Sequence, residues 1–255
     1  GAGGTVGTDR VAKAAPDGHT LLIATLAANA TAPSVYAKLP YDPTKDFAYI
    51  APLSFSANAL LVNAKLPINS LADLIGYAKA NPGKLAFSSP GVGISNHLAM
   101  ELFLIEAGIQ ALHVPYKGSG PAIAAVLSGE VQMSFDPVAS SLGHLRSGAL
   151  KAVGVSGRSR SPLLPDVPTV GEGGIRNVEA YTWNGLAAPA GTPRAIIERL
   201  HADVMNAFKQ VELRERLTKM GSEVIDMSPA EFQDFIGKEA VKWGAIARRV
   251  GAKVD

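Results

Sequence analysis

The sequence predicts an α/β protein, because short apolar runs of strand length alternate with amphipathic helical patterns along its 255 residues. This alternation favours a mostly parallel sheet flanked by helices. Two stretches, Tyr49–Asn58 and Glu179–Pro193, are interpreted as crossings between two lobes. With both crossings in place, residues 1–54 and 182–255 form lobe one, and residues 55–181 form lobe two. Two crossings make a hinge, which lets lobes close on a ligand.

The predicted strands are short apolar runs, typical of buried strands. They are Thr20–Thr25, Asn58–Asn63, Leu85–Ser89, Ala111–Pro115, Gln132–Phe135 and Lys151–Val155. In sheets of this kind the ligand crevice lies at the carboxyl ends of the strands. The residues that directly follow each run are therefore the first candidates for a binding site.

Helix start signals stand between or after the strands, each before an apolar stripe at helical spacing. The clearest are the capping-box pattern of Ser70 with Asp73, the expected N-cap and N1 pair of Thr192 with Pro193, and the capping-box pattern of Ser228 with Glu231. A capped start followed by one apolar stripe indicates a helix that packs on a sheet.

The composition is that of a folded, nearly neutral protein. Hydrophobic residues make up 47% of the chain and charged residues 18%, which excludes a disordered chain. The formal net charge is +2, so no large field favours nucleic acid or an anionic membrane. The tight basic groupings, Arg158 with Arg160 and Arg248 with Arg249, are expected to be solvated surface arginines.

Catalytic and metal-binding motifs are missing from the sequence. The chain has no cysteine, which excludes disulfides, thiol nucleophiles and zinc–thiolate sites. It shows no G-x-S-x-G elbow, P-loop or H-E-x-x-H motif. No apolar run reaches the roughly 20 residues that a membrane-spanning helix needs. The histidines have no metal-ligand spacing and are His19, His97, His113, His144 and His201. We therefore expect no enzyme, no metal and no cofactor.

The loop after the run Leu85–Ser89 is the strongest candidate site, in the segment KLAFSSPGVGISNHLAMELF (Lys84–Phe103). A strand ends near Ser88 and a helix starts near Ser95 or Asn96. The first N–H groups of a helix have no internal partner, and the helix dipole adds partial positive charge there. Glycines let the backbone approach a ligand, and hydroxyl and amide side chains add donors. The residues of this anion cradle are Ser88, Ser89, Gly91, Gly93, Ser95 and Asn96.

Two other interpretations of this loop remain open. It is also compatible with an ordinary capped turn, in which His97 is a polar residue bonded to nearby backbone. A dinucleotide-binding fingerprint is a weaker alternative, because Asn96 stands where the third glycine should fall.

A second turn of the same kind, Tyr116–Glu130, follows the run Ala111–Pro115. Pro121 suits the N1 position of a helix there, and Lys117 either adds charge or faces solvent. Two Gly-Ser turns after successive strands should lie on the same side of the sheet. Asp136 follows another strand and either accepts a hydrogen bond from a ligand or is the N-cap of the next helix.

Several long motifs in order make the chain similar to the Bug family, also called TctC-like proteins. The motifs are GAGGTVGTDRVAKAAPDGHTLLIAT, LPYDPTKDFAYIAPL, FSSPGVGISNHLAMELF, VPYKGSGPAIAAVLSGEV, GVSGRSRSPLLPDVPTVGE and WNGLAAPAGTP. The resemblance covers essentially the whole chain. It implies a periplasmic solute-binding receptor of a tripartite tricarboxylate transporter, with a two-lobed Venus-flytrap fold and one ligand in the cleft.

The resemblance also implies the ligand class and partners. Family ligands are small carboxylates: di- and tricarboxylates, acidic amino acids and aromatic acids. The loop Ser88–His97 matches a carboxylate-binding loop, and the segment with Ala27 and Asn29 matches one that faces the cleft. Asp136 matches an acidic position that helps to select the ligand. The residues beside the site on the returning crossing are Trp183 and Asn184. A monomer that binds membrane permease subunits is expected.

The chain departs from the family pattern at two points. Family members usually begin with a strand and a second carboxylate loop, P-F-x-x-G-G-x-x-D, and no such unit precedes Gly1. The first βα unit is therefore expected to be missing from this chain. Ile94 stands where the family often has threonine, which favours a more apolar ligand. A cytoplasmic α/β enzyme for a small acidic substrate and a ligand-presenting sensor subunit are the alternative functions.

Overall fold

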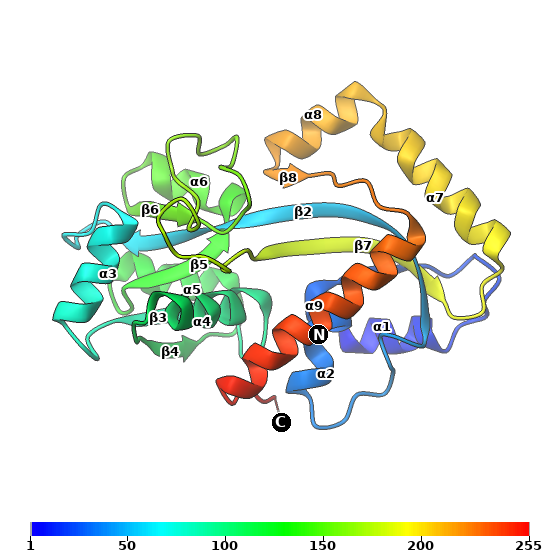
Figure 1. Ribbon diagram of the computed structural model, residues 1–255, viewed down its shortest axis with the longest axis horizontal. Helices are drawn as coiled ribbons and strands as arrows, with labels where there is room; N and C mark the ends of the chain where they lie inside the picture. The colour runs from blue at the N-terminus through cyan, green and yellow to red at the C-terminus, as the bar shows by residue number, and fades with distance from the viewer. Residues whose placement is uncertain (1, 255) are drawn as a thin grey trace. The chain divides into compact units, whose positions relative to one another are not determined.

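The computed structural model describes residues 2–254 and divides the chain into two compact units. Unit 1 consists of Gly1–Phe55 and Thr182–Asp255, and unit 2 of Ser56–Tyr181. The chain passes between the units twice, within the long strand β2 (Phe47–Asn63) and at the start of β7 (Tyr181–Pro189) (Figure 1). Both stretches that the sequence indicates as crossings are therefore extended strands.

Unit 1 combines a small sheet with helices. Its elements besides β2 and β7 are η1 (Ala2–Gly4), α1 (Thr5–Ala12), β1 (Leu22–Thr25), η2 (Ala27–Thr31), α2 (Ala32–Val35), α7 (Arg194–Phe208), α8 (Val211–Lys219), β8 (Ser222–Glu223) and α9 (Pro229–Arg249). Strand β1 pairs antiparallel with β7, β7 neighbours β2, and β8 also pairs with β2. Helix α9 packs against η2 and α2.

An aromatic cluster forms the centre of unit 1. The rings of Trp183 on β7 and of Phe232 and Phe235 on α9 contact one another with centroids 5.7–6.2 Å apart. A Cβ atom at Gly185 would overlap the Phe232 ring, so the strand needs glycine for the helix to approach this closely. Burial of such large rings provides most of the driving force for docking α9 on β7.

Unit 2 is a sheet with helices on its faces. Its elements besides the end of β2 are α3 (Leu71–Ala80), β3 (Ala86–Ser89), α4 (Ser95–Ala107), β4 (Leu112–Pro115), α5 (Ser119–Ser128), β5 (Met133–Pro137), α6 (Val138–Arg146) and β6 (Leu150–Val155). Strand β3 pairs parallel with β4 and β5, whereas β2 pairs antiparallel with β5 and β6. The strands β3–β6 therefore run in one direction and β2 runs against them.

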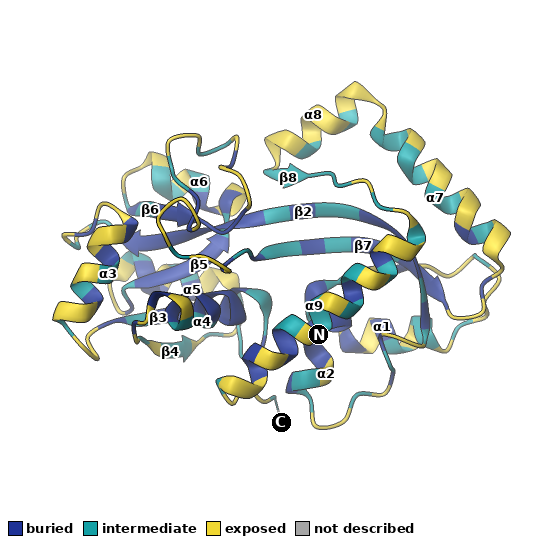
Figure 2. Cartoon of the chain, in the orientation of Figure 1, coloured by how far each residue is buried: buried dark blue, intermediate teal, exposed yellow. Residues whose placement is uncertain are grey.

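Strands β2, β3 and β5 of the unit 2 sheet are buried on both faces, which explains their uninterrupted apolar runs, whereas β4 is partly exposed (Figure 2). One face packs Ala59 and Leu61 of β2 against Val126 of α5 and Val138 of α6. On the other face Phe135 of β5 meets Phe103 of α4 edge to face, with centroids 6.2 Å apart. The two faces of β5 thus carry different partners, since successive side chains of a strand alternate in direction.

The observed helix starts can be compared with the N-caps that the sequence predicts. The Ser70 side chain accepts a hydrogen bond from Asp73 N, which confirms Ser70 as N-cap, while Asp73 Oδ2 accepts from Asn69 N, the residue before the cap. Ser228 with Glu231 forms a complete capping box, so that prediction is confirmed in full. Thr192 is not an N-cap: α7 starts at Arg194, and the Thr192 hydroxyl donates to Pro189 O. Pro121 is not at N1, because α5 already starts at Ser119. In both cases the turn before the helix, rather than proline, sets the start.

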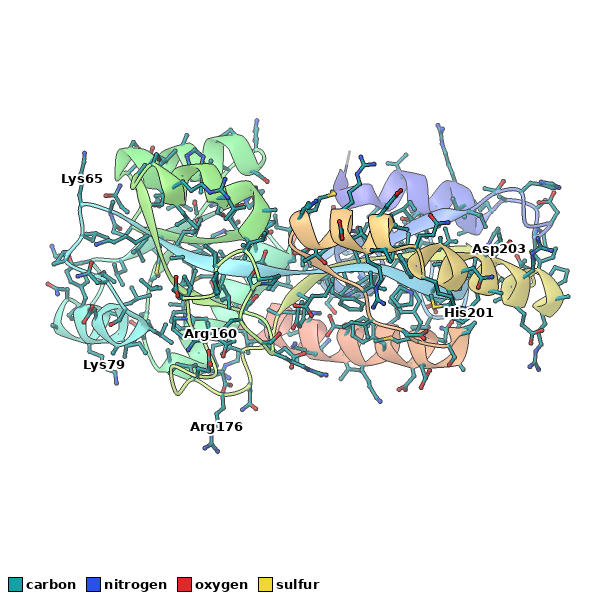
Figure 3. The ribbon with its side chains drawn as sticks, turned by 90° about the horizontal axis from the view of Figure 1, so that it is seen from above. Lys65, Lys79, Arg160, Arg176, His201 and Asp203 are labelled. Carbon is teal, nitrogen blue, oxygen red and sulfur yellow. The ribbon has the colours of Figure 1, made fainter. Side chains whose placement is uncertain are left out.

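The surface arginines of unit 2 form exposed ion pairs. Arg158 contacts Glu179 and Arg160 contacts Glu172 with N–O distances of 2.8 and 3.0 Å. Arg176 extends away from the ribbon (Figure 3). Exposed pairs of this kind contribute about 0–1 kcal/mol each, so they are not what holds the unit together.

Candidate functional site

The loop between β3 and α4, which the sequence predicts as an anion site, leads into a helix start without a side-chain cap from its N-cap residue. Helix α4 starts at Ser95, and its N-cap residue Ile94 makes no side-chain capping hydrogen bond. Gly93 has a φ of 75°, a conformation that favours glycine, and a Cβ atom at Gly91 would meet no atom within 4 Å. The loop therefore leaves open space beside a helix N-terminus whose N-cap side chain does not satisfy it.

The serines of this loop are bonded within unit 2. The buried Ser88 hydroxyl donates to Ala122 O of α5 at 2.9 Å. The buried Ser89 hydroxyl donates to Gly91 O at 2.9 Å, and its oxygen accepts from Gly91 N at 3.3 Å. Both hydroxyls thus shape the loop, whereas the sequence predicts them as donors to a ligand.

The first turn of α4 is fixed to its surroundings by side chains. The Asn96 carboxamide donates to Phe135 O of β5 at 2.8 Å, and Ser95 Oγ donates to Asn96 Oδ1 at 3.2 Å. His97 Nδ1 accepts from Gly93 N at 3.0 Å. The predicted backbone contact of His97 is confirmed.

The second Gly-Ser turn lies beside the first. Tyr116 N donates to Ser89 O at 2.9 Å, and Gly118 N donates to Pro90 O at 3.1 Å. Because β3 and β4 are parallel neighbours, their carboxyl ends share one edge of the sheet, as the sequence predicts. Lys117 is exposed, in agreement with its solvent-facing interpretation.

Asp136 lies near the same edge, at the end of β5. Its carboxylate is almost fully buried and accepts hydrogen bonds from Ser140 Oγ at 2.7 Å and Ser141 Oγ at 3.3 Å. Burial raises the pKa of Asp136, and the serine hydroxyls oppose the rise. The N-cap of α6 is Pro137, so the alternative of Asp136 as N-cap is wrong.

The candidate residues of unit 1 differ in how far they are buried and in what they bond. Asn29 has no exposed surface; its Oδ1 accepts from Thr25 N and its Nδ2 donates to the Tyr49 hydroxyl, both at 3.0 Å. Ala27 is half-buried at the start of η2. Asn184 is half-buried and donates to Ser54 Oγ at 3.2 Å. Of these side chains, only those of Ala27 and Asn184 reach the surface.

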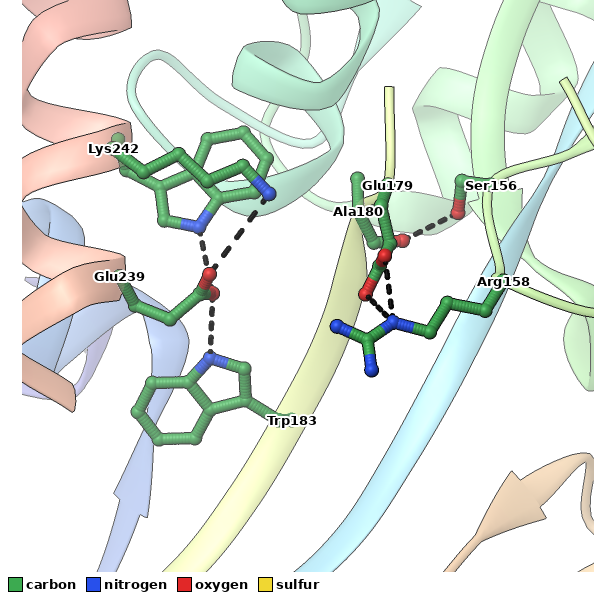
Figure 4. Close-up of polar contacts among 8 residues, drawn as sticks. Ser156, Arg158, Glu179, Ala180, Trp183, Glu239 and Lys242 are labelled. Carbon is green, nitrogen blue, oxygen red and sulfur yellow. Dashed lines mark hydrogen bonds and ion pairs between the residues drawn. The ribbon is translucent and has the colours of Figure 1, made fainter. Parts of the chain in front are cut away.

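Trp183 is a core residue of unit 1 with no exposed surface. Its Nε1 donates to Glu239 Oε2 at 3.1 Å, and Trp243 Nε1 donates to the same oxygen at 2.8 Å (Figure 4). Lys242 Nζ lies 3.9 Å from the other carboxylate oxygen. Sequence reasoning missed Glu239, because its partner Trp183 lies 56 positions away in the chain.

No cluster of histidine or acidic side chains suited to a metal ion occurs within residues 2–254. Over the same residues, no helix is both long and apolar enough to cross a membrane.

Solved structures of the same architecture are periplasmic binding proteins. A periplasmic transporter protein matches with a TM-score of 0.87 at 34% identity, over 100% of this chain and 85% of its own. R. palustris Rpa4515 with adipate matches with a TM-score of 0.88 at 32% identity and the same coverage. MatC of Rhodopseudomonas palustris with bound malate has a TM-score of 0.81 at 33% identity, over 96% of this chain and 85% of its own. The chain has the two-lobed periplasmic-binding-protein fold.

The sequence comparisons then give the family. The model of the tripartite tricarboxylate transporter family receptor, TctC, matches residues 1–252, and the chain belongs to this family. A UPF0065 protein in the tcbD-tcbE intergenic region of Pseudomonas sp. strain P51 is 37% identical, over 95% of this chain and 72% of that protein. BugT of Bordetella pertussis strain Tohama I is 35% identical, over 100% of this chain and 78% of BugT. Family and solved neighbours are solute-binding receptors, not enzymes.

Proposed function

We propose that the protein is a periplasmic receptor that captures a small carboxylate and delivers it to membrane permease subunits of a tripartite tricarboxylate-type transporter. The family supports the transport role, and the adipate and malate in two solved relatives support the ligand class. We also propose that units 1 and 2 are the two lobes of this receptor, with the boundaries that the chain contacts define.

The observation that carries the ligand class is the N-terminus of α4. Its N-cap residue Ile94 provides no capping acceptor, and the loop before it is open at Gly91. Backbone N–H groups and the helix dipole stabilise a carboxylate there without a basic side chain. A carboxylate bound to such fixed dipoles gains more when water is excluded, because the local dielectric falls.

The residues divide into direct and supporting roles in this proposal. Ile94 and Ser95 stand at the start of α4, where the helix dipole acts, and Asp136 selects ligands that carry a donor. Gly91 and Gly93 shape the turn, because their N–H groups donate to Ser89 Oγ and His97 Nδ1. Ser88, Ser89 and Asn96 hold the loop through their own hydrogen bonds. In unit 1, Ala27 and Asn184 are the candidates for contact, while Asn29 and Trp183 support them from the core.

A thermal-shift screen tests the proposal. The panel contains adipate, malate and other di- and tricarboxylates, each matched with its uncharged diamide or ester. A carboxylate at 100 times its Kd should raise the unfolding free energy by about 2.7 kcal/mol, whereas its neutral partner should not. A shift for both members of a pair, or for no acid in the panel, would contradict a carboxylate receptor.

The transport role needs a separate test. Cells with the permease subunits should accumulate the identified acid only when the receptor is present, and Ile94→Asp should abolish uptake because its own carboxylate occupies the helix N-terminus. Uptake that persists without the receptor would contradict a role in delivery.

A further inference from the structure

Two histidine rings stack beneath the loop that precedes α4. The rings of His97 on α4 and His113 on β4 have centroids 3.8 Å apart and an interplanar angle of 16°. Phe87 of β3 continues the stack, with its centroid 4.8 Å from that of His113. His97 has only 4% exposed surface. The parallel register that pairs Phe87 with His113 builds this stack.

Each histidine is bonded to one end of the same turn. His97 Nδ1 accepts from Gly93 N at 3.0 Å. His113 Nε2 lies 2.7 Å from Ser89 Oγ, the atom that accepts from Gly91 N and donates to Gly91 O. His97 therefore holds Gly93 directly, and His113 acts on Gly91 through Ser89 Oγ.

The hydrogen bond from Gly93 shows which ring nitrogen of His97 is the acceptor. An imidazole nitrogen accepts only through its lone pair, so Nδ1 carries no proton and the remaining proton is on Nε2. Nε2 lies 3.6 Å from Glu101 Oε1, which suits that tautomer. Burial, and after it the nearby His97, lowers the pKa of His113 to about 3, so this ring is neutral at ordinary pH.

We propose that His97 and His113 are positioning residues that hold the turn Ser89–Gly93 in its binding conformation only while both rings are neutral. The expected consequence is that ligand affinity falls on acidification, and this consequence rests on the proposed function. A proton on His97 Nδ1 would place a donor against the Gly93 N–H, and the turn would lose its anchor. Two charged rings at 3.8 Å would also repel each other.

Charged, titratable and neutral groups from α4, β4 and β3 face the stacked rings of His97 and His113. Glu101 on α4 is the acid recorded beside His97, and His113 on β4 is the other titratable group in contact with it. Strand β3 contributes the Phe87 ring and the Ser89 hydroxyl, neither of which carries charge at these pH values.

The test compares two substitutions at one position. His97→Asn keeps an acceptor near the place of Nδ1 but does not titrate, whereas His97→Phe keeps the ring and removes the acceptor. His19→Asn, the same change at an exposed histidine, is the matched control. His113→Phe, which keeps the stack and loses the Ser89 contact, serves if either His97 variant fails to fold.

The first readout needs no ligand. Hydrogen exchange of the Gly91 and Gly93 amides, corrected for intrinsic rates, should accelerate in the wild type as pH falls. It should be fast at every pH in His97→Phe and slow at every pH in His97→Asn. Nitrogen NMR shifts of the His97 ring should report an unprotonated Nδ1 at neutral pH.

The second readout is affinity for adipate or whichever acid the screen identifies. His97→Phe should bind roughly five- to tenfold more weakly, the loss of about one hydrogen bond. His97→Asn should bind as the wild type does and lose its pH dependence. The proposal would be overturned if His97→Asn behaved like His97→Phe. It would also be overturned if the hydrogen exchange of the wild type did not change with pH. If no acid binds but exchange titrates as expected, the proposed function fails and the positioning role stands.

Discussion

Two fully buried asparagines, one in each unit, differ in how their side chains are bonded. Asn29 of unit 1 and Asn58 of unit 2 both have no exposed surface. The Asn29 side chain is bonded at both ends, to Thr25 N and the Tyr49 hydroxyl. Neither Oδ1 nor Nδ2 of Asn58 has a partner among the described residues, and the same is true of the nearby Ser134 hydroxyl. A buried polar group without a partner costs stability, so Asn58 and Ser134 carry a cost that Asn29 does not.

Two helix starts, one in each unit, also differ. In unit 1, α9 begins with a complete capping box at Ser228 and Glu231. In unit 2, α4 begins after Ile94 with no cap from that side chain. Asn58 pairs with Pro137 at the end of β5, the strand whose Phe135 carbonyl accepts from Asn96 of α4. In unit 2 the Ser134 hydroxyl, unpartnered among the described residues, lies on the strand that pairs with β3, at the residue opposite Ser88.

The largest loss of stability is expected at Glu239 of unit 1, which accepts hydrogen bonds from two indole N–H groups. Glu239→Leu should lower the unfolding free energy by about 2–5 kcal/mol, because two buried indole N–H groups lose their common acceptor. Urea unfolding followed by tryptophan fluorescence measures this, since both tryptophans of the chain, Trp183 and Trp243, lie in unit 1. Glu198→Leu, which breaks an exposed pair with Arg194, is the control and should cost at most about 1 kcal/mol. Equal losses would show that the carboxylate is not a structural acceptor.

The contrast between the asparagines predicts unequal costs for the same change. Asn29→Leu should destabilise by about 1–3 kcal/mol, because Thr25 N and the Tyr49 hydroxyl lose partners. Asn58→Leu should be neutral or stabilising, because it removes a buried amide that has no partner. Chemical denaturation with hydrogen exchange at β1 and β2 separates the two units. Reversed costs would remove the contrast between the units.

Asp136 makes the stability of unit 2 depend on pH. Because burial raises its folded pKa, the folded state holds this proton more tightly than the unfolded chain. Stability should therefore fall as pH rises from the ordinary aspartate value, about 3.9, through the raised one. Asp136→Asn should remove that fall, and the difference between the two unfolding curves across the acidic range measures it. A wild-type curve parallel to that of Asp136→Asn would contradict the raised pKa.

The smallest effects concern the caps and have opposite signs. Ser228→Ala should destabilise by about 1 kcal/mol through the loss of the capping box. Ile94→Asp should stabilise by up to about 1 kcal/mol, because it gives α4 a charged cap. Thermal unfolding measures both, and Ile94→Asp should also lose carboxylate binding. A gain in stability with unchanged affinity would place the ligand elsewhere.

The fold was largely predictable because its signals are local. Each strand from β1 to β6 overlaps a run that the sequence indicates, and the caps at Ser70 and Ser228 are built from residues three positions apart. The helix starts at Thr192 and Pro121 were wrong by one or two residues, because proline is tolerated both just before a helix and within its first turn. The loop before α4 was also correctly located, since strand, glycines and helix are consecutive.

The sequence by itself determined the alternation of strands and helices, the position of the candidate loop and the family. Only the tertiary structure decided what the polar side chains do. Asn29 and Trp183 became core residues through Tyr49 and Glu239, and His97 met His113 only because β3 and β4 pair in parallel. Local signals depend on neighbours in the chain, whereas the partner of a hydrogen bond or a ring depends on which distant segments folding brings together.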